Sequence, residues 1–89
     1  MKAVVSVVGK DAVGIIAKVS AVCAECGASI SDISQTVLDE YFTMIMMVEI
    51  DALNIPFGAF SDRMTALGKK ENLEIHVMHE NIFNSMHRI

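Results

Sequence analysis

The stretch GKDAVGII, residues 9–16, combines two glycines five positions apart with an acidic side chain between them. It follows the apolar run AVVSVV and precedes a pattern of helical spacing, so a glycine-bounded turn leads into the start of a helix. Backbone amides at a helix start lack partners inside the helix and bind anions readily. The segment therefore predicts a cradle for a small anion.

The residues after the second glycine limit what this cradle can hold. A phosphate-binding P-loop has Lys and then Ser or Thr there, whereas this chain has Ile15 and Ile16. The helix-start amides suit a carboxylate, and Asp11 could accept a hydrogen bond from an ammonium group, so the turn is complementary to a zwitterion. The alternative stays open that Gly9 and Gly14 serve only a tight turn and close helix–sheet packing, with Asp11 as a helix cap.

Other groups of reactive side chains predict no further chemistry. The pair in CAEC, Cys23–Cys26, falls late in a predicted helix and on its apolar face, so we expect buried, unreactive thiols. His76 and His79 are three apart on a predicted strand and cannot share one metal ion, which leaves only an adventitious surface site with Glu80 and His87. No nucleophile stands beside a base in the sequence. We expect no metal, no cofactor and no enzymatic activity.

Six segments of distinct periodicity must position the turn. They predict the order β-α-β-β-α-β over residues 2–8, 15–26, 28–39, 41–50, 52–67 and 73–80. Asn54 is a candidate cap of the second helix, with Pro56 in its first turn, and Gly27 is a candidate residue for ending the first helix. Two helices on one face of a four-stranded antiparallel sheet make an α+β, ferredoxin-like fold, in which right-handed crossovers give the strand order 4-1-3-2.

The second strand is predicted at an edge of the sheet because both of its faces are partly polar. Strict alternation along it places Ile30 and Asp32 on one face, and Ser31 and Ile33 on the other. The first and third strands are far more apolar, which suits central positions.

The bulk composition restricts the partners. A single domain of 89 residues with 53% apolar residues and a mean hydropathy of +0.46 carries more apolar material than one small core can hide, so we expect a homo-oligomer, a dimer in the simplest case. No apolar run approaches the roughly 20 residues that span a membrane. A net charge of −4 without a basic block disfavours nucleic acid, and two cysteines in a chain without a recognisable leader favour the cytoplasm.

The first half of the chain resembles an ACT domain. The resemblance rests on a G-x-D-x-x-G-I loop after the first strand, then on G-x-x-I-x-D-I-x-Q and a strand of the F-x-M-x-M-x-V type. It extends over residues 1–80 and is closest to small bacterial and archaeal proteins that consist of one ACT domain. It is more distant to the accessory protein that regulates glycine cleavage. Residues 81–89 remain as a short amphipathic C-terminal helix or tail, which we expect to pack on the domain or on a partner subunit.

The resemblance implies a regulatory sensor that binds an amino acid, or a similar carboxylate, between two copies of the domain. By position, the ligand contacts are Asp11 and Gly14 in the loop, and Ser29 with Ile30 in the segment that leads into the second strand. The chain departs from the family pattern at Val13, where Pro is common, and at Ser29, where Asn often contacts the ligand.

A second hypothesis is a protein-interaction module with the same fold and no ligand. It would depend on Ile45, Met47 and the C-terminal tail. A regulated protein is a further candidate partner under both hypotheses.

Overall fold

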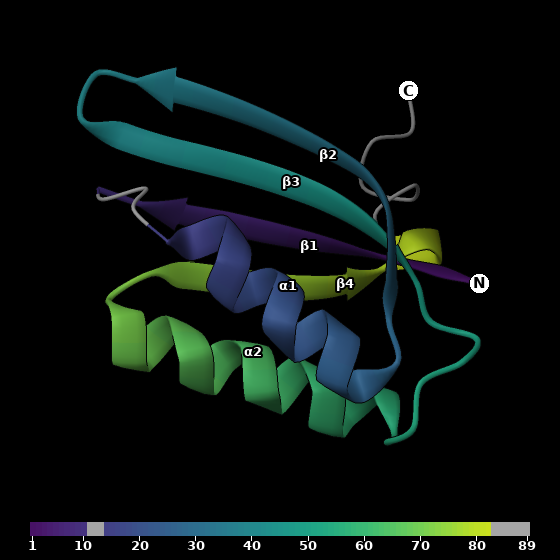
Figure 1. Cartoon of the computed structure of the whole chain (residues 1–89). Helices are drawn as coiled ribbons and strands as arrows, with labels where there is room; N and C mark the ends of the chain where they lie inside the picture. Colours follow the sequence, from purple (N-terminus) through teal and green to yellow (C-terminus); the bar gives the residue numbers. More distant parts are fainter. Residues whose placement is uncertain (11–13, 83–89) are drawn as a thin grey trace.

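The structure is a computed structural model that describes residues 1–10 and 14–82 (Figure 1). Its elements are β1 (Lys2–Gly9), α1 (Ile15–Cys26), β2 (Ser29–Leu38), β3 (Tyr41–Glu49), α2 (Phe57–Glu71) and β4 (Glu74–His79). The strands form one antiparallel sheet in the order β2-β3-β1-β4, and both helices cover the same face. The predicted ferredoxin-like fold and strand order are confirmed.

A short helical turn at 80–82 follows β4, and the remainder of the predicted tail, residues 83–89, lies outside the described residues. Within residues 1–10 and 14–82, the helices are too short or too polar to cross a membrane.

The core lies between the two central strands and the helices. The core-facing residues of β1, Val5 and Val7, pair with Met46 and Met44 of β3 and are fully buried. The helices complete the core with further fully buried side chains, namely Val19, Cys23, Cys26, Phe60 and Met64. Burying an apolar side chain of this size contributes about 1.5–3 kcal/mol, so this layer fixes where both helices lie.

The predicted faces of β2 were wrong, although its edge position is confirmed. The pairing of β2 with β3 shifts register between Ile30 and Asp32, so Ile30 and Ile33 both pack against the core. The extra residue is Ser31, whose hydroxyl donates to the Met47 carbonyl over 3.1 Å. Because a bulge inserts one residue into one strand only, every side chain after it points to the opposite face from strict alternation.

Helix α1 ends as predicted and α2 begins differently. Gly27 has a φ of +82° and its amide points back toward the carbonyls of the last turn of α1. The start of α2 was predicted too early, because the helix begins at Phe57 with Pro56 at the N-cap. The Asn54 side chain does not cap it and instead donates to the Glu25 carbonyl over 2.8 Å.

We expect Gly27→Ala to destabilise the protein by about 2 kcal/mol or more. A Cβ at this left-handed position costs about 1–2 kcal/mol and would lie 2.5 Å from the Ala52 carbonyl oxygen. The matched control is Gly58→Ala in α2, where nothing lies within 4 Å of the added carbon and the helix should gain about 0.5 kcal/mol. Urea denaturation of both variants measures the difference, and equal midpoints would contradict the requirement for glycine at position 27.

Candidate ligand site

Gly14 forms the N-cap of α1 in a left-handed conformation, with a φ of +73°. Its carbonyl accepts the first helical hydrogen bond, from the Lys18 amide over 3.1 Å, and no side chain of the described residues caps the helix. Among the same residues, a Cβ at this position would meet only the Lys18 Cε, at 3.9 Å. The left-handed turn is therefore what requires glycine here, and the amides of the first helical turn are left without helical acceptors.

The predicted partner of these amides in the loop, Asp11, lies outside the described residues, as do residues 12 and 13. Its assignment as a cap or as an ammonium contact stays a prediction.

Ser29 and Ile30 lie at the other end of α1, where the chain enters β2. Ser29 is exposed and pairs with Glu49, while Ile30 is half-buried against the core opposite Val48. Because α1 has 12 residues and a helix rises about 1.5 Å per residue, Gly14 and Ser29 are separated by roughly 18 Å. Figure 1 shows the two ends of α1 at opposite ends of the sheet. One chain therefore does not bring the two halves of the predicted site together.

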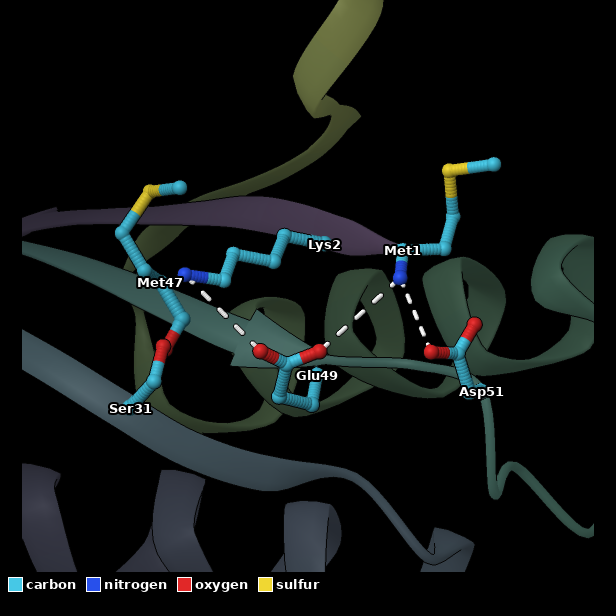
Figure 2. A network of polar contacts seen from close by, with 6 residues as sticks. All are labelled: Met1, Lys2, Ser31, Met47, Glu49 and Asp51. Atoms are coloured by element: carbon cyan, nitrogen blue, oxygen red, sulfur yellow. Dashed lines mark hydrogen bonds and ion pairs between the residues drawn. The ribbon is translucent and has the colours of Figure 1, made fainter.

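A cluster of charged groups lies at the Ser29 end of the sheet (Figure 2). The Met1 ammonium donates to Asp51 over 2.9 Å and lies 3.9 Å from Glu49, and the Lys2 Nζ lies 3.8 Å from the other Glu49 oxygen. The hydrogen bond to Asp51 raises the pKa of the Met1 ammonium group. The cluster ties the start of β1 to the end of β3, the strand with which Ser29 pairs.

The C-terminal end of α1 is held by Arg63 of α2, a contact that the sequence analysis missed. One guanidinium nitrogen donates to the Cys26 Sγ over 3.1 Å and another donates to a Glu25 carboxylate oxygen over 2.9 Å. The hydrogen bond to Glu25 raises the pKa of Arg63. The backbone amide of Asn54 also donates to the Cys26 carbonyl, over 2.9 Å. These contacts fix the turn that leads into Ser29, and no local spacing in the sequence signals them.

Both thiols are free and buried, which confirms their predicted location on the apolar face of α1. Burial raises the pKa of the Cys23 thiol to about 11, with a further contribution from Cys26. In the described part of the chain, no group of three or more His, Cys, Asp or Glu side chains could hold a metal ion.

Comparisons with known proteins agree on one family. The family model of the ACT domain matches residues 2–78. UPF0237 proteins of Clostridium acetobutylicum and Clostridium perfringens are 46% and 47% identical to this chain over the full length of each. A solved ACT domain protein from Streptococcus pneumoniae is 47% identical, with a TM-score of 0.82 over 93% of both chains.

A more distant solved structure is named as a candidate glycine cleavage system transcriptional repressor. It shares 22% identity and a TM-score of 0.68 with this chain, over 85% of this chain and 43% of its own. At that identity the likeness shows a shared fold.

We expect the stability of the protein to fall between pH 9 and pH 11 because of Cys23. An unperturbed thiol ionises near 9.0, whereas the folded thiol keeps its proton to about 11. Above pH 9 the unfolded chain therefore binds fewer protons than the folded chain, and the stabilisation present below pH 9 is lost as pH rises. The loss reaches about 2 kcal/mol by pH 11.

Urea denaturation at pH 8 and pH 10.5, with Cys23→Ala as the control for all other titrating groups, measures this effect. Parallel pH dependence in the two proteins would refute it. Thiol labelling should also be slow in native buffer at pH 8 and fast in urea.

Proposed function

The chain belongs to the ACT domain family, and we propose that it is a regulatory sensor that binds a small amino acid between two copies of itself. ACT domains are typically regulatory ligand-binding domains. The observation that carries the proposal is the separation of Gly14 from Ser29 by the whole length of α1. A site that needs both residues is incomplete in one chain and needs a second copy.

The edge strand β2 offers a way to complete the site. Gly9 pairs with Phe42, and Leu38 pairs with Tyr41, so β2 ends at the same end of the molecule as Gly14. If two β2 strands pair antiparallel about a two-fold axis, Ser29 of one copy comes to the Gly14 end of the other. The two-fold axis then creates two equivalent sites.

Exposed apolar side chains support the same interface. Val37 and Leu38, near the end of β2, are 69% and 73% exposed. A second copy along this edge would remove both from water and would pair the free amides and carbonyls of β2, which are a liability when left open. A second copy on this edge agrees with the homo-oligomer expected from the apolar composition of the chain.

The proposed ligand contacts follow from the charges of a zwitterion. The amides at the start of α1 bind the carboxylate, helped by the positive end of the helix dipole. Asp11 accepts from the ammonium group, and Ser29, with Ile30 beside it, closes the site from the partner subunit. The role proposed for this arrangement is binding and not catalysis.

The proposal also includes the cellular compartment and the partners of the protein. Two buried free thiols suit a reducing compartment such as the cytoplasm. The sensor would act by presenting its ligand-bound dimer to a regulated protein. Residues 81–89 would pack on the domain or on the partner subunit.

The second candidate function is a ligand-free interaction module, and one observation favours it. Ile45 is 41% exposed in the middle of β3, on the sheet face that the helices leave open. This alternative replaces the sensor if no amino acid binds and Ile45→Lys abolishes binding of the chain to a regulated protein.

We expect one or more amino acids to bind the wild-type protein, and Asp11→Ala to weaken the binding at least tenfold, because the ammonium loses its acceptor. A thermal-shift screen of the twenty amino acids identifies the ligand, since a ligand of the folded state raises the melting temperature, and calorimetry measures its affinity. The matched control is Asp62→Ala, an exposed aspartate of α2, which should bind normally. Absence of binding at millimolar concentration would overturn the sensor.

We expect two defective variants to restore each other when mixed. Asp11→Ala removes the acceptor of the ligand ammonium, and Ser29→Tyr fills the site with a large side chain that is favourable in a strand. In a heterodimer of the two, one site combines both defects and the other is intact. An equal mixture should therefore recover about a quarter of the wild-type binding sites, whereas a site within one chain recovers none.

Sedimentation gives an independent check of the dimer. Only a 9.7 kDa species at micromolar concentration would exclude the proposed interface.

A further inference from the structure

A cavity of about 500 Å³ opens at the end of the sheet where β1 stops. Its walls come from the end of β1 at Val8–Lys10, from Tyr41 at the start of β3, and from the turn between α2 and β4. These three segments meet at the end of the sheet to which the arrow of β1 points in Figure 1. The volume lies within the range of about 300–1,000 Å³ that is usual for small-molecule sites.

The floor of this cavity is apolar and closely packed. Leu73, which packs on the core, supplies its apolar side chain, whereas Val8 alternates with the core-facing Val7 and points to the open face of the sheet. A Cβ at Gly9 would lie 2.3 Å from the Leu73 Cδ2, and one at Gly68 would lie 2.7 Å from the Leu73 carbonyl oxygen. The absent Cβ at Gly68 lets α2 approach the Leu73 backbone closely, and the absent Cβ at Gly9 leaves room for the end of the Leu73 side chain.

The rim of the cavity carries two ammonium groups in a protein of net charge −4. Lys10 and Lys69 both line it. The Lys10 Nζ lies 5.8 Å from the centre of the Tyr41 ring and 3.9 Å from a Glu40 oxygen, so the ring and a weak ion pair hold it beside the opening. For Lys69, no carboxylate oxygen of the described residues lies within 4 Å.

One carboxylate, that of Glu74, also lines the cavity among the residues that the structure describes. One of its oxygens lies 3.4 Å from the His76 Nε2. Among the described residues, Lys10 therefore already has a weak ion pair with Glu40, and Lys69 is the ammonium group of the rim that no carboxylate contacts.

We propose that this cavity binds a small organic anion, whose carboxylate or phosphate lies between Lys10 and Lys69 and whose apolar body rests on Leu73. Lysine suits either head group because its ammonium is a point charge without the fixed geometry of arginine. Gly14 and Ser29, the described contacts of the proposed amino-acid site, do not line the cavity, and the proposal goes beyond the sensor function.

The test uses three probes that separate charge from apolar contact: phenyl phosphate, inorganic phosphate and benzyl alcohol. Titrations followed by the amide NMR signals of Gly9, Gly68 and Leu73 locate the binding. Phenyl phosphate should bind more tightly than either of the other two, because only it uses both the rim and the floor. Adding phenylacetate decides the head group, since tighter phenylacetate assigns a carboxylate and tighter phenyl phosphate assigns a phosphate.

Three lysine variants test the rim. Lys10→Gln and Lys69→Gln should each weaken phenyl phosphate about two- to fivefold, as is usual for one exposed charge, and the effect should shrink at high salt. The matched control is Lys70→Gln, which removes the same charge from the same helical turn but from a residue that does not line the cavity. It should change the affinity less than twofold.

Three results would overturn this site. The first is that 10 mM phenyl phosphate shifts none of the amide signals of Gly9, Gly68 and Leu73. The others are that benzyl alcohol binds as tightly as phenyl phosphate, or that Lys70→Gln weakens phenyl phosphate as much as the two rim variants do. None of these results bears on amino-acid binding by the wild-type dimer, so the two proposals stand or fall separately.

Discussion

The burial of α1 against the central strands is the constraint on which the rest of the structure depends. The apolar face of α1, with Val19 and Cys23 fully buried, shares one core with the buried residues of β1 and β3. Both ends of the helix turn at glycines in the left-handed conformation, Gly14 and Gly27, so its length is fixed. The distance between the loop after β1 and the start of β2 follows from that length. Every proposal about a shared ligand site rests on this separation.

Local patterns predicted the elements and failed where distant segments meet. The apolar runs of β1 and β3 were sufficient to place them in the centre of the sheet, where their core-facing residues, such as Val5 and Met46, are buried beneath the helices. The bulge at Ser31 could not be predicted, because it depends on how β2 aligns with β3 and not on β2 alone. The position of Asn54 predicted a helix cap, but its side-chain amide donates instead to the carbonyl of Glu25 at the end of α1.

The candidate site divides in the same way. The turn at Gly14 was visible in the glycine spacing, because a helix start after a strand is a local event. Ser29 was assigned by resemblance, and nothing in the residue pattern itself pairs it with Asp11. The cavity beside Lys10 had no signal at all, because its walls come from β1, β3 and the turn after α2. Likewise Arg63 lies 37 residues from Cys26, and only the packing of α2 on α1 brings them into contact.

A site divided between two copies has a thermodynamic consequence for a sensor. If the ligand binds only where the loop of one chain meets Ser29 of another, ligand binding and dimerisation share one free energy of coupling. The factor by which the ligand tightens the dimer must equal the factor by which dimerisation improves ligand affinity. Because the edge strand exposes Val37 and Leu38, the proposed dimer would gain from apolar burial before any ligand binds, and the ligand would shift that same equilibrium further. Such a sensor would then report ligand concentration through its state of assembly.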